Sequence, residues 1–192
     1  MRVIAGSARG TKLETPKGLM VRPTSDRVKE ALFNIIAPLI QDSVFLDLYA
    51  GSGAVGIEAL SRGAGICVFV ENKKNNIALI KENLYKTGLS KNARVIPGEV
   101  KKTVHTLARE AFIADLIYLD PPYASDDAPY VINQLLEKEI LYEHSLLIVE
   151  HSHKNTRWKE KLANAFQLKT QRKYGDTCLT FIQFSCPVRD PE

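Results

Sequence analysis

The chain has 192 residues, of which 45% are hydrophobic and 25% charged; this excludes a largely disordered protein and fits one domain with a sizeable core. No apolar run approaches the ~20 residues of a membrane span, and the opening residues lack the apolar region of a signal peptide, so we expect a cytoplasmic protein with no membrane partner. The net charge of +4 is unevenly spread, because bases dominate residues 1–29 and 154–173. Two basic patches indicate a phosphate-bearing partner, although solvated surface charge would explain either patch alone.

The first residues predict a small basic hairpin. Arg2–Ala5 and Thr11–Glu14 are strand-like and flank a turn rich in glycine, and the hairpin carries Arg2, Arg9 and Lys12. A two-stranded ribbon is marginal alone, so it must pack on the main domain or on a ligand. Prolines and a glycine keep the next segment extended until Thr24 or Ser25, either of which can cap a helix that continues to Pro38.

Strand-like and helix-like segments then alternate. This order predicts an α/β fold with a mostly parallel sheet covered on both faces, and a C-terminal hairpin that adds an antiparallel strand at the edge. The predicted strands are 44–48, 66–70, 94–96, 114–119 and 146–149; the predicted helices are 54–62, 75–87, 100–111, 128–138 and 157–164; and the hairpin pairs 167–173 with 178–184. Ligands of such sheets bind beyond the carboxyl ends of the strands, where Asp47, Glu71 and Asp120 stand.

The loop after the first of these strands has two interpretations. Residues 47–56 contain Gly-x-Gly-x-x-Gly between a strand and a helix, with Glu71 twenty positions after Gly51, which is the fingerprint of an NAD-binding enzyme. Asp47, however, is awkward beside a pyrophosphate and suits a cationic group such as the amino group of S-adenosylmethionine. The loop is also longer than a tight pyrophosphate turn. Asp47 as an ordinary cap of the loop is the structural alternative.

A second polar stretch, Asp120-Pro121-Pro122-Tyr123, ends the apolar run of residues 114–119. Two prolines lack backbone donors and therefore mark the end of a strand. A carboxylate that accepts from a planar amine, beside an aromatic ring that stacks on a base, is the arrangement required to methylate the amine of a nucleobase. A strand-ending turn with a surface tyrosine is the alternative.

Together these segments resemble the class I S-adenosylmethionine-dependent methyltransferases that act on amines. More narrowly, the chain up to about Cys186 resembles the RsmD family, the bacterial enzymes that methylate N2 of a guanine in 16S ribosomal RNA. The resemblance rests on residues 2–6 with Gly10 and Leu13, on 22–34, on 47–53, on Gly98-Glu99 and on 120–123. One departure is that Gly98-Glu99-Val100 stands where relatives often carry Asp and Ala.

The resemblance implies a Rossmann-like fold with a seven-stranded sheet. It also implies a domain at 19–186, preceded by a basic hairpin extension at 1–18 and followed by a tail at 187–192. The implied cofactor is S-adenosylmethionine, and the implied partner is 16S ribosomal RNA in the small subunit or its assembly intermediate. The three cysteines are odd in number and the histidines show no metal spacing, so we expect reduced cysteines and no metal.

Roles for individual residues follow from the resemblance. Asp47 would order the methionine portion of the cofactor, Glu71 would accept the ribose hydroxyls, and Glu99 would flank the adenine. The full cofactor set is Asp47, Ala50, Gly51, Gly53, Glu71, Asn72, Glu99 and Asp120. Asp120 and the Pro121 carbonyl would hold the amine while Tyr123 stacks on the base. The expected RNA contacts are Arg2, Arg9, Lys12, Arg22 and Thr24, and helix capping is an alternative role for Thr24.

Other functions stay open on the sequence alone. A DNA adenine-N6 methyltransferase would use the same Asp-Pro-Pro-Tyr stretch, but 192 residues leave little room for target recognition. Methylation of a protein glutamine is an alternative with less support, because such enzymes more often place Asn where this chain has Asp120. The alternatives of a different class are an NAD-dependent oxidoreductase and a non-catalytic RNA-binding module.

Overall fold

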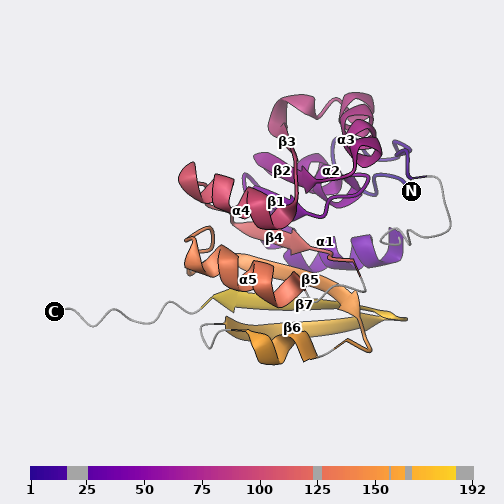
Figure 1. Cartoon of the computed structure of the whole chain (residues 1–192). Coiled ribbons are helices and arrows are strands. Elements are labelled where there is room, and N and C mark those ends of the chain that lie inside the picture. Colours follow the sequence, from indigo (N-terminus) through magenta and orange to yellow (C-terminus); the bar gives the residue numbers. More distant parts are fainter. Residues whose placement is uncertain (17–25, 123–126, 156, 163–165, 185–192) are drawn as a thin grey trace.

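The computed structural model describes residues 1–16, 26–122, 127–155, 157–162 and 166–184. Its centre is a seven-stranded sheet with the strand order β3-β2-β1-β4-β5-β7-β6 (Figure 1). The strands are β1 (Val44–Leu48), β2 (Ile66–Glu71), β3 (Ala93–Pro97), β4 (Leu116–Leu119), β5 (Leu146–Ser152), β6 (Phe166–Tyr174) and β7 (Thr177–Phe184). The α-helices are α1 (Asp26–Ile40), α2 (Ala54–Ser61), α3 (Lys74–Thr87), α4 (Val100–Arg109) and α5 (Asp127–Glu137).

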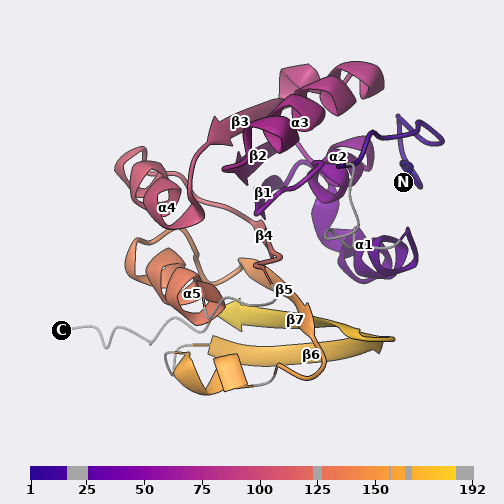
Figure 2. The ribbon, with the colours of Figure 1, turned by 45° about the vertical axis from the view of Figure 1, so that its right-hand side comes forward.

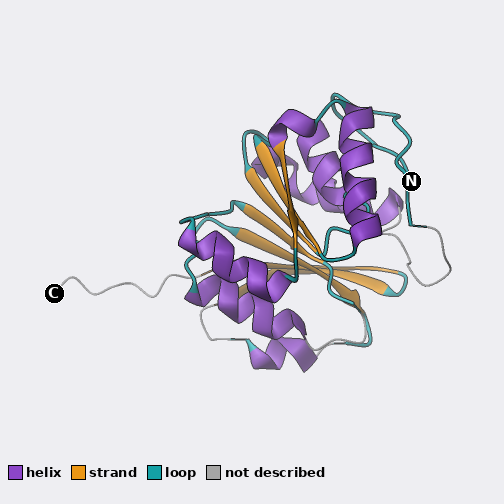
Figure 3. Ribbon diagram, turned by 45° about the horizontal axis from the view of Figure 1, so that its top comes forward, coloured by secondary structure: helices purple, strands orange, loops and turns teal. Residues whose placement is uncertain are grey.

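Strands β1 to β5 pair in parallel, and β7 lies antiparallel between β5 and β6. The predicted mixed sheet with an antiparallel terminal hairpin is therefore confirmed. Helices cover both faces of the sheet (Figure 3). One core cluster joins α1, α2 and α3 to the sheet, and the other joins α4 and α5 to it. Because both faces are buried, a central strand such as β4 is apolar throughout and shows no alternation.

The strand order reverses at the pair β1 and β4, which are neighbours in the sheet although two strands separate them in the chain. At such a switch point the loops that leave the two strands diverge toward opposite faces and leave a crevice at the carboxyl edge. The expected ligand-binding acids of β1, β2 and the β4 terminus all belong to this edge.

Most observed helices begin or end within two residues of the predicted bounds, and two of the differences concern α1 and the last predicted helix. Helix α1 continues past Pro38 to Ile40, because proline costs the last turn only one backbone hydrogen bond while Ile36 and Ile40 stay buried in the core. The Ser43 hydroxyl and N–H both donate to the Ile40 carbonyl and so close the end of the helix. The helix predicted at 157–164 is a 3-10 helix at Arg157–Lys161, and residues 163–165 lie outside the described part.

The first sixteen residues form an arm that lies against the helices of one layer (Figures 1 and 2). Its two sides meet at an antiparallel bridge between Arg2 and Lys12, and the Val3 N–H donates to the Thr11 carbonyl at 3.0 Å. Val3 and Leu13 are buried in the same core cluster as α1 and α2. The two sides of the expected hairpin thus meet at this one bridge, without regular strands in residues 1–16, and the arm packs on the main domain.

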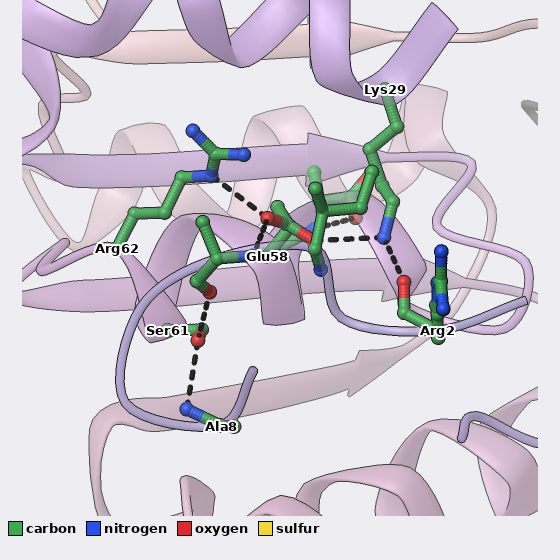
Figure 4. Close-up of polar contacts among 10 residues, drawn as sticks. Arg2, Ala8, Lys29, Glu58, Ser61 and Arg62 are labelled. Carbon is green, nitrogen blue, oxygen red and sulfur yellow. Dashed lines mark hydrogen bonds and ion pairs between the residues drawn. The ribbon is translucent and has the colours of Figure 1, made fainter. Parts of the chain in front are cut away.

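A buried ion pair fastens this arm to the domain (Figure 4). Glu58 of α2 accepts the Lys29 ammonium at 2.8 Å, and neither side chain is exposed. The same carboxylate accepts the backbone N–H groups of Ile4 and Ala5 at 2.8 and 3.0 Å and the Arg62 Nε at 2.8 Å. Every carboxylate lone pair is used, so the arm is held through its main chain.

The turn of the arm approaches α2 so closely that only glycine fits at position 6. Gly6 has φ +85°, and a Cβ there would lie 1.7 Å from the backbone oxygen of Ser61. Gly6→Ala should therefore cost about 3 kcal/mol of unfolding free energy or displace the arm. Gly10→Ala is the matched control, since Gly10 has φ +87° with nothing within 4 Å of a Cβ.

Urea unfolding of both variants separates packing from backbone strain. The control should lose only the cost of its backbone conformation, about 1 kcal/mol. Equal losses for the two glycines would show that the close approach at Ser61 is not required.

Candidate active site

Three carboxylates from separate segments meet at the carboxyl edge of the sheet. Asp47 lies in β1, Glu71 is the last residue of β2, and Asp120 directly follows the last residue of β4. Strand β1 pairs with β2 on one side and with β4 on the other, which brings all three to one place. The charge of Glu71 contributes to a raised pKa of Asp47, and the charge of Asp47 contributes to a raised pKa of Asp120, so the three carboxyls lie close together.

Asp47 is 2% exposed and caps α2, because its Oδ2 accepts the Gly56 N–H at 2.9 Å. The loop-capping interpretation of this residue is therefore realised in the structure, and within the described residues no hydrogen bond to the second carboxylate oxygen is seen. Burial raises the pKa of Asp47 to about 7; the Glu71 charge adds to this shift, and the Gly56 hydrogen bond opposes it. A cationic group bound here would favour the ionised carboxylate.

The raised pKa of Asp47 gives a prediction for stability against pH. Between pH 3.8 and about 7 the folded protein retains a proton on Asp47 that the unfolded chain has lost, so the free energy of unfolding falls as pH rises. Asp47→Asn keeps an acceptor for Gly56 and removes this term, which is on the order of a few kcal/mol. Urea unfolding at pH 5 and pH 8 should show that the free energy of unfolding of the variant, relative to that of wild type, is higher at pH 8 than at pH 5. Parallel pH profiles of the two proteins would contradict the assignment.

The loop between β1 and α2 is shaped by residues with left-handed backbone. Tyr49, Gly51 and Gly53 have φ values of 62°, 57° and 77°. The two glycines serve different purposes. A Cβ on Gly53 would press on Ile80 at 3.2 Å, so this glycine is needed for packing. A Cβ on Gly51 would find its nearest neighbour 4.0 Å away, so Gly51 leaves open space where a ligand can approach the backbone.

Glu71 organises this loop with all four of its acceptor positions. Its Oε2 accepts the Gly51 N–H at 2.9 Å and the Asn76 side-chain amide at 3.1 Å, and its Oε1 accepts the N–H groups of Asn72 and Lys73 at 2.8 Å each. A ribose diol could therefore bind only by replacing one of these donors. The Asn76 amide has the longest of these hydrogen bonds and is the only donor on a side chain, so it is the partner best able to move.

A buried asparagine joins the loop to the N-terminal arm. The Asn83 side chain is fully buried in α3 and donates to the carbonyls of Ser52 and Glu14, at 3.0 and 2.9 Å. Its Oδ1 accepts the Glu14 N–H at 2.7 Å. The sequence reasoning missed both Asn76 and Asn83; their signal is a polar residue at helical spacing with the apolar Ile80 and Leu84.

Asp120 has an acidic neighbour that sequence reasoning also missed. Leu119 pairs with Val149, so the next residues along these parallel strands, Asp120 and Glu150, stand side by side. Glu150 is 3% exposed and accepts a hydrogen bond from the Tyr118 hydroxyl. Burial raises the pKa of Asp120 well above its usual range, and the charges of Glu150 and Asp47 add to this.

The remaining predicted residues are spread more widely. Ala50 lies in the loop, where its carbonyl accepts the Gly53 N–H at 2.7 Å, and Pro121 is half-buried beside Asp120. Glu99 is exposed, stands at the N-cap position of α4, and pairs with Lys102 at 3.1 Å. Arg22, Thr24 and Tyr123 lie outside the described residues.

The basic residues of the arm do not join the three carboxylates. Arg2, Arg9 and Lys12 are exposed, and the arm's turn donates the Ser7 N–H to Ser61 at the carboxyl end of α2. The glycine loop leads into the opposite, amino end of that helix. In the described part of the chain no group of three or more His, Cys, Asp or Glu could hold a metal ion, and no helix is long and apolar enough to cross a bilayer.

Comparison with known proteins places the chain in a family. The family model described as Conserved hypothetical protein 95 matches residues 1–183. Ribosomal RNA small subunit methyltransferase D of Escherichia coli (strain K12) is 34% identical over 188 residues, which cover 92% of this chain and 93% of that protein. The chain belongs to the RsmD family.

Solved structures agree with membership of the RsmD family. An Escherichia coli protein described as the methyltransferase yhhF superposes with a TM-score of 0.82 at 32% identity, covering 97% of this chain and 99% of that one. SMU.776, a methyltransferase solved as a complex with SAH, has a TM-score of 0.74 at 19% identity, covering 87% of this chain and 51% of that one. The second likeness shows the fold alone, that of the class I methyltransferases.

Proposed function

We propose that this chain transfers a methyl group from S-adenosylmethionine to the exocyclic N2 amine of a guanine in 16S ribosomal RNA. The observation that carries the proposal is the meeting of Asp47, Glu71 and Asp120 at the carboxyl edge of β1, β2 and β4, where two parts of one reaction can be held together. The names of the RsmD relatives give small-subunit ribosomal RNA as the substrate class, and the guanine amine follows the family resemblance.

The residues on the cofactor side fit S-adenosylmethionine, which when bound supplies a methyl group already activated on a sulfonium. Asp47 offers a buried oxygen to the ligand's amino group, and Gly51 leaves its backbone open to close approach. Glu71 can receive ribose hydroxyls once the Asn76 amide turns away. The SAH complex of a protein with the same fold supports this choice of ligand. Ala50, Asn72 and Glu99 would flank the ribose and adenine.

The residues on the acceptor side would prepare the amine. The lone pair of guanine N2 is delocalised into the ring, so the amine is a weak nucleophile. Asp120 and the Pro121 carbonyl would accept hydrogen bonds from the two N–H groups of this amine and align the nitrogen for in-line attack. Tyr123 would stack on the ring. A carbon–nitrogen bond then forms as the carbon–sulfur bond breaks, and the amine's extra proton leaves toward Asp120 or water. The base must leave its stack to reach this edge.

Substrate RNA would also contact the basic residues at the start of the chain. Arg2, Arg9 and Lys12 project from an arm whose main chain is fixed by Glu58, so they would position RNA through its phosphates without reading sequence. Arg22 and Thr24, which lie outside the described residues, are further RNA contacts on the family resemblance alone. Higher salt should then weaken RNA binding.

An NAD-dependent oxidoreductase is the competing function for the glycine loop. The carboxylate of Asp47 directly beneath the loop disfavours a pyrophosphate there. Calorimetry with S-adenosylmethionine and with NAD separates the two, and we expect binding of the former only. Tritium transfer from the cofactor to small ribosomal subunits that lack the modification then separates an enzyme from a non-catalytic RNA-binding module. Tighter binding of NAD would end the methyltransferase proposal.

A further inference from the structure

We propose that Arg172, on the terminal hairpin, binds an RNA phosphate next to the target nucleotide and so forms the second side of the substrate site. The inference rests on the proposed function and extends it to a surface for which that function gives no role. It starts from the basic stretch 154–173, which sequence reasoning noted as a patch and which the arm does not explain.

The sheet register places Arg172 in line with the site. Asp120 stands beside Glu150, Glu150 pairs with Leu179, and Leu179 pairs with Arg172. Residues opposite one another in neighbouring strands project from the same face. Tyr118, two residues before Asp120, and Leu179 belong to the same core cluster, which confirms that this row lies on one face.

The separation suits a nucleotide. Three strand-to-strand steps of ~4.8 Å place the Cα of Arg172 about 14 Å from that of Asp120, and the long arginine side chain shortens the gap. When a guanine has left its stack and its amine lies at Asp120, the phosphates on either side of that nucleotide stay outside the site. Those phosphates would lie along the carboxyl edge of the sheet, where the turn between β6 and β7 also lies.

Arg172 is free to take such a partner. It is exposed on the edge strand β6, and among the described residues its guanidinium donates only to the Thr170 hydroxyl at 2.7 Å and the Gln171 carbonyl at 3.2 Å. Within the described ranges it makes no ion pair, and neither does its neighbour Lys173. A guanidinium without a carboxylate partner retains its full charge and its paired donors for a phosphate.

Basic residues on an edge strand also have a purely structural use, because they prevent pairing with another sheet. That use predicts no difference between neighbouring positions of the strand. The RNA contact predicts a difference between Arg172 and Lys173, because Lys173 is the next residue of the strand and projects from the opposite face. Lys173→Glu is therefore a matched control. Lys138→Glu is a second control, at an exposed position after α5 and near the amino end of β4.

The test measures tritium transfer to small ribosomal subunits from a strain lacking the modification. Arg172→Glu should raise KM for the subunits about tenfold or more and leave kcat within about twofold. The dissociation constant for S-adenosylmethionine and the melting temperature should not change. The slope of log KM against log salt should fall by about one, the loss of one phosphate contact. Arg172→Lys should lie between wild type and the charge reversal.

Two results would overturn the inference while leaving the proposed function in place. One is a KM for Arg172→Glu no higher than that for Lys138→Glu. The other is an equal rise for Lys173→Glu, which would show that the face of the sheet does not matter. Failure of the proposed function is distinguishable, because wild type would then bind cofactor and yet transfer no methyl group to the subunits; that result removes both.

Discussion

Asp120→Ala should lower methyl transfer to small ribosomal subunits by about 10²- to 10³-fold or more, the loss expected when one preorganised hydrogen-bonding partner of a reacting centre is removed. The variant should keep most of its affinity for S-adenosylmethionine, because in the proposed site Asp47, Gly51 and Glu71 would make the larger share of the cofactor contacts. Tritium transfer and calorimetry on the same preparation measure the two properties separately. Full activity of Asp120→Ala would refute the role of this residue.

Asp120→Asn distinguishes the two chemical roles of the carboxyl. The raised pKa of Asp120 means that the side chain holds its proton to a higher pH than an ordinary aspartate, and a neutral carboxyl can still accept an N–H bond through its carbonyl oxygen. If Asp120 only orients the amine, the asparagine variant should retain part of the activity and lose its dependence on pH. If Asp120 must take the proton, the asparagine variant should be as inactive as the alanine variant.

Glu58→Ala should destabilise the fold by about 3–5 kcal/mol, because it leaves the fully buried Lys29 ammonium without its partner. The backbone N–H groups of Ile4 and Ala5 would also lose their acceptor. For a chain of this size the loss corresponds to a drop in melting temperature of roughly 6–20 °C. Hydrogen exchange at Ile4 and Ala5 should become faster, since the arm is held there.

The acid side of the stability profile gives a second readout for Glu58. Burial alone would raise its pKa, but the Lys29 ammonium and the Ile4 N–H hold the pKa of this carboxyl below its usual 4.5. The stability it provides is therefore present above pH 4.5 and lost as pH falls through the lowered value, and Glu58→Ala should lack this loss.

Glu110→Ala is the matched control for Glu58→Ala. It removes a carboxylate whose partner, Arg94, is exposed, and it should change stability little. Similar melting temperatures for the two variants would contradict a special role of the buried pair.

The sequence was sufficient to predict the sheet and three acidic residues at its carboxyl edge. Runs such as Leu116–Leu119 are apolar on every residue because both faces of the sheet are covered, and the prolines after Asp120 mark where such a run ends. Asp47, Glu71 and Asp120 were recognisable because each lies at or within one residue of the carboxyl end of a strand, and the carboxyl edge is where sheets of this kind bind ligands.

The partners of those acids were not recognisable in the same way. Glu150 becomes relevant only because β5 lies beside β4 in register, and Asn83 only because α3 lies between the arm and the glycine loop. Glu58 stands in a short helix that is buried on every residue, so its charge has no meaning until Lys29 and the arm are placed against it. Such contacts depend on tertiary packing, which local patterns do not encode.

Mapping the transferred methyl group tests the central claim most directly. Small ribosomal subunits from a strain lacking the modification would be incubated with the protein and with S-adenosylmethionine carrying a deuterated methyl group, and the 16S RNA digested to nucleosides for mass spectrometry. We expect the label on N2-methylguanosine, at one position, and its absence with Asp120→Ala. Label on another base or on protein, or none while the cofactor binds, would contradict the pairing of a methyl-donor site with a guanine amine at the carboxyl edge of this sheet.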